Sequence, residues 1–287
     1  MNANHTSFLP AALALALTSS VHAAVCEPWL APYAGADATG RHVIALWRFE
    51  AGAATNDAGP NGLHLRFQGA AASTNGRFGG ALESLAGAQE LERKHGAVAP
   101  DHPALSPAGA FTIEAWMCPS AAFTNAGEAF LVDKKYAGHT DYQFTIGAPD
   151  KGGRRALHAR LGFGEASEGF VSDTAVFAPG AWAHVAFTYD GEGRGRFFLN
   201  GSPLGGGDRP GRGPVVRGKL GVTLGDRTGS YYHAFPGLLD EVRICSGVRE
   251  FRRAAIALVS DRTAFVRMEP AAPLRFAPRA AGHQWRW

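Results

Sequence analysis

The 287-residue sequence has few charged and few sulfur-containing residues: 18% are Asp, Glu, Lys or Arg, and only three are cysteine and three methionine. Its 28 basic and 25 acidic residues leave a formal net charge of +3. The basic residues are scattered and form no stripe with interleaved aromatics, which argues against a nucleic-acid surface. The sequence also has no Gly-Lys-Ser/Thr phosphate loop, no His-x-x-x-His or Cys-x-x-Cys spacing and no internal repeat. Nucleotide binding and a zinc site are therefore not expected.

No apolar run is long enough to span a bilayer comfortably. The short apolar stretch 9–17 leads to Val21-His22-Ala23, which fits the small-x-small cleavage pattern of a secretory signal peptide. We therefore predict a signal peptide over residues 1–23 and a secreted protein, extracellular or periplasmic. The first residues contain His5 but neither Lys nor Arg, so an uncleaved anchor is the alternative.

Export makes a disulfide possible, and Cys26, Cys118 and Cys245 allow at most one bridge and a free thiol. Cys118 and Cys245 both end strand-like runs, so either can instead be a small buried apolar residue. Val25 precedes Cys26 where a lipid-modification site favours Gly or Ala, which argues against a lipidated N-terminus.

Short β-type runs separated by turn signals recur through the chain, and 37 glycines and 17 prolines punctuate it. The runs are 43–49, 63–67, 111–117, 130–132, 142–146, 156–163, 170–177, 183–189, 196–199, 220–224 and 237–244. Asn200-Gly201 predicts a two-residue hairpin turn. Residues 205–213, rich in Gly and Pro, predict a surface loop, and Glu250 to Ser260 is the one predicted helix.

The pattern indicates one domain over residues 24–260, followed by a tail or linker over 261–287. Six groups of segments, in order, resemble the laminin-G-like jelly roll of the concanavalin A-like lectin/glucanase superfamily. They are 45–50, 57–63, 79–82 with 111–117, 182–190, 196–201 and 235–244.

The resemblance implies an all-β fold, a two-sheet antiparallel jelly-roll sandwich, with one short C-terminal helix. Trp47, Trp116 and Trp182 are then expected to fill the gap between the sheets. Glu114, Glu241 and Arg243 lie in otherwise apolar strands and are interpreted as structural ions that pair across a sheet.

The resemblance also implies a structural calcium ion near the opening strand, the turn after it and the closing strand. By match to the motif, Asp57 and Asp240 are carboxylate ligands, Asn61 and Gly59 offer further oxygens, and Glu50 is a fifth candidate. The alternative is that Asp57 and Asn61 only stabilise a turn through local backbone amides.

The loop 226–235 concentrates aromatic side chains beside polar ones. Exposed aromatic rings flanked by hydrogen-bonding groups are a common way to hold sugars. We therefore expect Asp226, Arg227, Tyr231 and Tyr232 to contact a ligand. The alternative is that the two tyrosines pack over a sheet edge and form no site.

Nothing in the sequence marks a catalytic centre. Jelly-roll glycosidases related to the family place Glu-x-Asp-x-x-Glu on one strand, and this pattern is absent. Asp240 and Glu241 are neighbours and are expected to point to opposite faces of a strand. Tyr142 with His158 or His184 is compatible with a lyase but unspecific.

The sequence thus predicts a secreted, non-catalytic module that binds a glycan or cell-surface polysaccharide, with or without further domains of a larger protein. Two alternatives stay open: a structural or protein-interaction domain without a sugar site, and a divergent polysaccharide hydrolase or lyase. The first expectation rests on analogy between folds.

Overall fold

The structure, a computed structural model, describes residues 25–26, 31–84, 94–229 and 233–251. The predicted signal peptide 1–23, the tail 261–287 and residues 252–260 of the predicted helix lie outside these residues. No helix among the described residues is long and apolar enough to cross a membrane.

The described chain is almost entirely β-structure. Its strands are β1 (Val25–Cys26), β2 (Val43–Trp47), β3 (Arg66–Gln68), β4 (Ala71–Gly76), β5 (Gly79–Ser84), β6 (Gly96–Ala99), β7 (Phe111–Pro119), β8 (Ala129–Asp133), β9 (Tyr142–Ile146), β10 (Arg155–Gly162), β11 (Ser167–Ala175), β12 (Ala183–Tyr189), β13 (Arg194–Leu199), β14 (Ser202–Asp208), β15 (Val222–Leu224), β16 (Gly237–Ser246) and β17 (Glu250–Phe251). The helical segments are α1 (Ala36–Thr39) and the single 3₁₀ turns η1 (Pro103–Leu105) and η2 (Ala121–Asn125).

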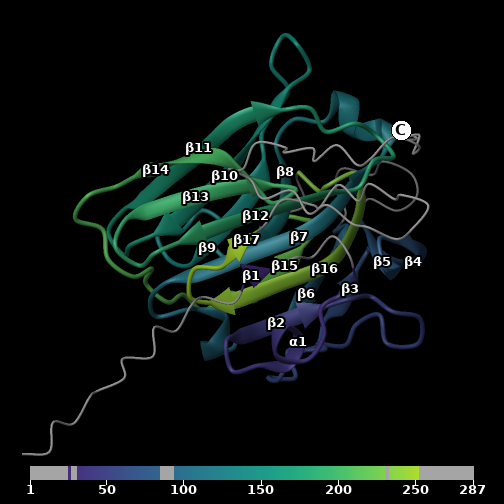
Figure 1. The fold of residues 1–287 in the computed structure, drawn as a ribbon, viewed down its shortest axis with the longest axis horizontal. Coiled ribbons are helices and arrows are strands. Elements are labelled where there is room, and N and C mark those ends of the chain that lie inside the picture. The colour runs from purple at the N-terminus through teal and green to yellow at the C-terminus, as the bar shows by residue number, and fades with distance from the viewer. Residues whose placement is uncertain (1–24, 27–30, 85–93, 230–232, 252–287) are drawn as a thin grey trace, which may run out of the picture.

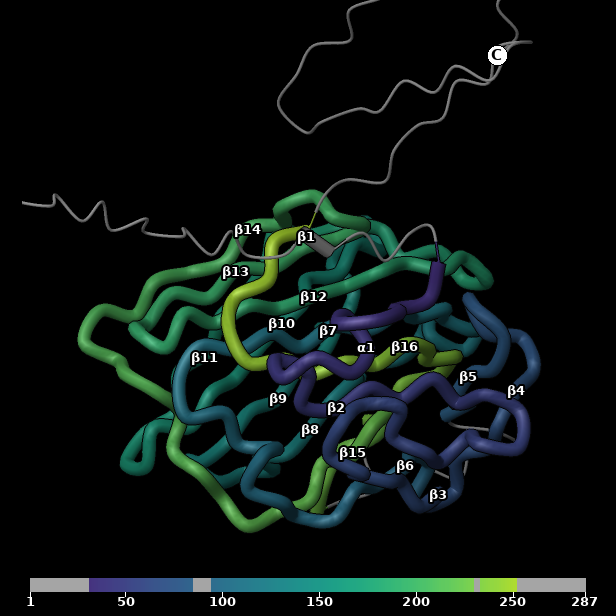
Figure 2. The backbone as a smooth tube through the Cα atoms, turned by 60° about the horizontal axis from the view of Figure 1, so that its bottom comes forward, coloured from purple at the N-terminus to yellow at the C-terminus, as the bar shows by residue number. Residues whose placement is uncertain are grey.

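Apart from β1 and β17, which pair with each other in parallel, the strands form two antiparallel layers that share one continuous path. One layer, the β7 sheet, runs β4-β5-β16-β7-β12-β13-β14, and β2 also pairs with β16. The other, the β9 sheet, runs β3-β6-β15-β8-β9-β10-β11, and a single β11–β14 pair at Ser172 and Gly205 joins the two. The same orders can be followed across Figure 1 and Figure 2. The predicted all-β jelly-roll sandwich is confirmed.

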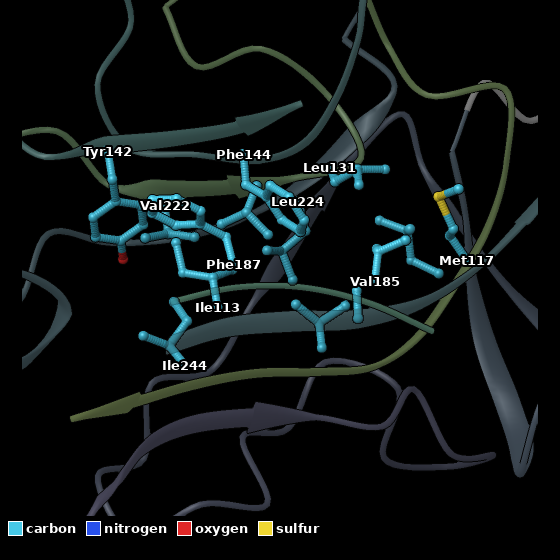
Figure 3. Packing of buried hydrophobic residues seen from close by; sticks show 14 of the residues in the cluster. Ile113, Met117, Leu131, Tyr142, Phe144, Val185, Phe187, Val222, Leu224 and Ile244 are labelled. Atoms are coloured by element: carbon cyan, nitrogen blue, oxygen red, sulfur yellow. The ribbon is translucent and has the colours of Figure 1, made fainter. Parts of the chain in front are cut away.

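The core lies between the two sheets. In β7, Phe111, Ile113, Ala115 and Met117 point inward, as the two-residue period of a strand requires. Figure 3 shows side chains of the β9 sheet, including Tyr142 and Phe144, meeting Ile113, Val185 and Ile244 of the β7 sheet. Burial of this apolar surface is the main stabilising contribution to the fold.

Of the three tryptophans expected between the sheets, Trp47 alone lies there. It is fully buried there, and its indole N–H donates to the Leu63 carbonyl at 2.8 Å. Trp116 belongs to a second cluster on the outer face of the β7 sheet, with Ala186 and Phe251, and Trp182 packs against this cluster. The expectation for Trp116 and Trp182 was wrong because the inward positions are odd-numbered in β7 and also in β12, which begins directly after Trp182.

A buried network of charges lies on that same outer face. Arg243 donates from Nε and Nη2 to Glu114 Oε1, both at 2.6 Å, and His184 Nε2 lies 2.9 Å from Glu114 Oε2. Tyr33 donates its hydroxyl to Glu114, and Arg243 lies over the Tyr33 ring. Burial raises the pKa of Glu114, but Arg243, His184 and Tyr33 outweigh it and lower the pKa to about 2. The predicted structural ion pair of Glu114 and Arg243 is confirmed. Through Tyr33, the network also connects the segment before α1 to the β7 sheet.

The hairpin predicted at Asn200-Gly201 is confirmed: both residues have positive φ, 47° and 74°, and Leu199 pairs with Ser202. The predicted surface loop 205–213 is wrong at its start, because β14 continues to Asp208. A side chain at Gly206 would collide with the Gly195 carbonyl of β13, since its Cβ would lie 2.2 Å from that oxygen. Glycine there permits close pairing of two strands.

The predicted helix from Glu250 begins on residues that form β17.

Cys118 and Cys245 lie on neighbouring strands but at opposite ends of their ladder. Cys118 pairs with Leu238, whereas Cys245 pairs with Thr112. A bridge between them would need Cα atoms within about 7 Å, so this register excludes it. Cys118 is a free thiol in the structure, and burial raises its pKa. The side chain of Cys26 lies outside the described residues, so the disulfide stays a prediction.

Candidate functional site

The turn after β2 is organised by Asp57. Its carboxylate accepts the backbone N–H groups of Leu46 at 2.9 Å, Gly59 at 2.8 Å and Leu63 at 2.9 Å. The Asn61 amide donates to the Ile44 carbonyl at 2.8 Å. A carboxylate has about four lone-pair positions, and three are used here. Asp57 and Asn61 therefore stabilise the turn through backbone groups, as the alternative expected, and calcium ligation by Asp57, Asn61 and Gly59 stays a prediction.

The other two predicted metal ligands, Glu50 and Asp240, meet at the β4–β5 turn. Asp240 accepts the Phe78 N–H at 2.9 Å, and Glu50 accepts the Gly80 N–H at 3.2 Å. Burial raises the pKa of Asp240 to about 6, and the Glu50 charge adds to this rise. The described residues contain no group of three or more His, Cys, Asp or Glu side chains placed to hold a metal. Calcium ligation by Glu50 and Asp240 likewise stays a prediction, and the Asp240 carboxylate also accepts the Glu241 N–H at 2.6 Å.

A bulge in β16 places Asp240 and Glu241 on the same face. Leu239 and Val242 both enter the core, the register shifts between them, and Glu241 has a φ of 46°. The expectation that the two carboxylates point to opposite faces was wrong, because a bulge adds one residue between inward positions. Both side chains are nevertheless buried, and burial raises the pKa of Glu241 to about 7 against the effect of Arg48.

Of the four predicted ligand-binding residues, Asp226 and Arg227 are described, and Tyr231 and Tyr232 lie outside the described residues. Asp226 is buried and accepts the N–H groups of His95 at 2.9 Å and Arg227 at 2.7 Å, so it shapes the loop. The Arg227 guanidinium lies over two rings, 5.0 Å from the centroid of Tyr136 and 5.6 Å from that of Phe130.

Tyr136 is the aromatic side chain that sequence reasoning missed. It is 38% exposed and has a φ of 52°, a left-handed conformation that is uncommon for a bulky residue. Its ring lies against Gly229, where an added Cβ would come within 3.0 Å of the ring Cγ. Strained backbone of this kind persists only where the surroundings hold it in place, and it concentrates at functional sites.

Asp133, at the end of β8, joins the two loops that carry these residues. Its carboxylate accepts N–H groups of Lys135 at 2.9 Å, Tyr136 at 3.2 Å and Thr228 at 2.9 Å. Gln143 of β9 donates to the Tyr136 carbonyl at 2.7 Å. We call this arrangement the two-loop site. It comprises Lys135, Tyr136, Arg227 and Gly229 above Asp133 and Gln143, on the outer face of the β9 sheet.

The three side chains considered for a lyase, Tyr142, His158 and His184, do not lie close together. Tyr142 is in the core, where its hydroxyl donates to the Leu105 carbonyl at 2.9 Å, and burial raises its pKa well above the usual value. His158 is on the outer face of the β9 sheet, 4.0 Å from Glu128, whereas His184 is buried on the outer face of the β7 sheet. The three side chains therefore lie on different layers.

A separate open groove of about 580 Å³ lies at one end of the sandwich. Its lining is largely the backbone of glycines 109, 191, 211 and 213 with Asp190 and Arg212. Asp190 accepts the N–H groups of Glu192 and Arg194, and Arg212 pairs with Glu168. No aromatic ring is among the described residues that line the groove, so the groove lacks the stacking surface for a sugar that Tyr136 provides at the two-loop site.

Residues 92–252 match the family model described as the concanavalin A-like lectin/glucanases superfamily, which is more than half of the chain. The chain belongs to this superfamily. No curated protein matches the sequence.

Solved structures with a similar fold include domains of bacterial toxins and of an arabinanase. The binding domain of Paraclostridial Mosquitocidal Protein 1 superposes with a TM-score of 0.54 at 15% identity, over 72% of this chain and 49% of that one. Domain 4 of AbnA, an extracellular GH43 arabinanase from Geobacillus stearothermophilus solved with arabinotriose, gives 0.52 at 19% identity, over 72% and 93%. The botulinum neurotoxin serotype D binding domain gives 0.54 at 12% identity, over 72% and 48%. This chain thus spans about half the length of the toxin domains, and at these identities the likeness shows the fold alone.

Proposed function

We propose that this chain is a secreted, non-catalytic carbohydrate-binding or adhesion module whose sugar site is the two-loop site. The observation that carries the proposal is the half-exposed Tyr136 ring, held against Gly229 and beside Arg227. An aromatic face next to hydrogen-bond donors suits a sugar, which presents both C–H faces and hydroxyl groups. The arabinotriose bound to the AbnA domain supports this choice of ligand class.

The site is also fixed before any ligand arrives. Asp133 ties both loops to β8 through three backbone N–H groups, and Gln143 holds the Tyr136 carbonyl. A ring that is already ordered costs little further side-chain entropy on binding. Tyr231 and Tyr232, two and three residues after Gly229, stay predicted ligand residues.

A calcium ion, in this proposal, is held by Glu50 and Asp240 at the β4–β5 turn and stabilises that turn. Ca²⁺ needs six to eight oxygen ligands, so these two carboxylates supply only part of the set. The ion is structural, because the two-loop site is on the other sheet.

The direct test is binding of the full chain to a panel of plant, algal and animal polysaccharides, followed by calorimetry on the positives. Tyr136→Ala is expected to raise Kd about tenfold, which corresponds to about 1.4 kcal/mol. Val176→Ala is the matched control, since Val176 is 65% exposed and lies far from the site at the end of β11. Its Kd should be unchanged.

Three results would contradict the proposal. If Tyr136→Ala leaves binding intact, the sugar does not bind at the two-loop site. A chain that binds no polysaccharide would favour the structural or protein-interaction alternative. Turnover of a polysaccharide would favour the hydrolase or lyase alternative.

A further inference from the structure

A row of side chains crosses the outer face of the β9 sheet and leads to the two-loop site. Arg160 of β10 pairs with Gln143 of β9, and Gln143 pairs with Asp133 of β8. Directly opposed residues of an antiparallel pair share one face, so Arg160 projects from the face that carries Tyr136. Strands lie about 4.8 Å apart, which places the Arg160 backbone about 10 Å from that of Asp133.

Three cationic side chains gather along this row: Arg160, Lys135 and Arg227. Burial lowers the pKa of Lys135, and the nearby charges of Arg160 and Arg227 lower it further, against Asp133. Within the described part of the chain none of the three forms an ion pair, and the Arg227 Nε is buried without a hydrogen-bond partner. The row therefore carries positive charge that lacks ion-pair partners.

The acidic side chains nearby do not neutralise this charge at the surface. Asp133 and Asp226 are both fully buried, and their oxygens accept backbone N–H groups. Glu128 lies five residues before Asp133, so about 16 Å along β8, and it accepts from Thr145 near His158. An anion that approached Tyr136 would meet the exposed Arg160 and the half-buried Arg227, whereas Lys135 is buried and donates to the Gly138 carbonyl.

We propose that the two-loop site takes an acidic polysaccharide, whose carboxylate groups accept from Arg160 and Arg227 while a sugar ring contacts Tyr136. This inference rests on the proposed function and specifies its ligand class. Arginine is suited to the task because its planar fork donates two parallel hydrogen bonds to a carboxylate. Arg160 is exposed and Arg227 is half-buried, so both are within reach of a chain lying across β9 and β10.

The experiment compares polygalacturonate with its fully methyl-esterified form, which keeps the backbone and removes the charge. Chondroitin sulfate, which adds sulfate groups, desulfated chondroitin and neutral arabinan complete the panel. The wild-type chain is expected to bind polygalacturonate at least tenfold more tightly than the ester, with affinity falling as salt rises from 50 to 500 mM. Arg160→Gln should weaken this binding about tenfold.

Arg41→Gln is the matched control. It removes the same charge from an exposed arginine that lies between α1 and β2, on the side of the β7 sheet. Its Kd should stay within twofold of wild type.

Each other outcome is decisive. Equal binding of the ester or of arabinan, lost in Tyr136→Ala, would overturn the acidic ligand and leave the proposed function standing. Polygalacturonate binding unchanged in Arg160→Gln would overturn the assigned residues. Binding of chondroitin sulfate, but of neither polygalacturonate nor desulfated chondroitin, would overturn the carboxylate as the recognised group. No binding to any polymer would overturn the proposed function as well.

Discussion

Alanine at Gly229 should damage the two-loop site, whereas alanine at Gly153 should not. Both glycines have left-handed backbone, with φ of 70° and 73°. An added Cβ at Gly229 would lie 3.0 Å from Tyr136 Cγ, while at Gly153 nothing lies within 4 Å. Both variants thus place a side chain on left-handed backbone, but only Gly229→Ala displaces the Tyr136 ring.

The magnitudes follow from these contacts. Left-handed backbone costs an L-residue about 1–2 kcal/mol, so both variants should melt about 2–8 °C below wild type. In Gly229→Ala the Tyr136 ring must also move by a few tenths of an ångström. If its sugar contact is worth about 1 kcal/mol, Kd should rise about fivefold.

Calorimetric titration with the best polysaccharide, beside thermal denaturation of each variant, separates the two effects. Gly153→Ala should lose stability and keep wild-type affinity. Equal affinities of the two variants would show that the position of the Tyr136 ring does not determine binding.

Two further predictions concern the buried charges. Glu114→Gln leaves Arg243 without its charged partner and should lower the free energy of unfolding, measured by urea denaturation, by about 3–5 kcal/mol. Glu168→Gln, in the more exposed pair with Arg212, should lower it by at most about 1 kcal/mol. Similar losses in the two variants would contradict a stabilising role of the buried network. Asp240 and Glu241 have pKa values raised to about 6 and 7 from 3.8 and 4.5, so the stability they contribute is complete below about pH 4 and is lost as pH rises through 6 and 7. Glu114, with its pKa lowered to about 2, contributes stability above pH 4.5 that is lost toward pH 2. Melting temperature should therefore peak near pH 4, and Asp240→Asn should flatten its fall toward pH 8. Calcium should raise it more at pH 8 than at pH 5, because the ion binds ionised carboxylates, and an absent calcium effect at pH 8 would sink the structural ion.

Much of the fold could be predicted because buried strands carry their own pattern. The strands at Tyr142–Ile146 and Ala183–Tyr189 coincide with the predicted runs, since both are apolar or aromatic enough to be recognised alone. β14 was missed because its three consecutive glycines are typical of a loop. Only the close approach of Gly206 to β13 explains why glycine is needed within that strand.

The errors at the site have a different origin. The bulge at Glu241 depends on one left-handed residue, which no local pattern indicates. Tyr136 belongs to a short loop that looks unremarkable until Arg227 and Gly229, about 90 residues later, are placed against it. Arg227 itself was predicted from its loop, but its aromatic partner could be identified only once the fold brought the two loops together.

Hydrogen–deuterium exchange of the full chain, with and without the polysaccharide it binds most tightly, can locate the ligand on the fold. Ligand at the two-loop site should slow exchange over residues 133–143 and 226–229 and leave residues 109–111 and 190–193 of the end groove unchanged. Slower exchange at the groove with no change around Tyr136 would show that the polysaccharide does not bind at the two-loop site.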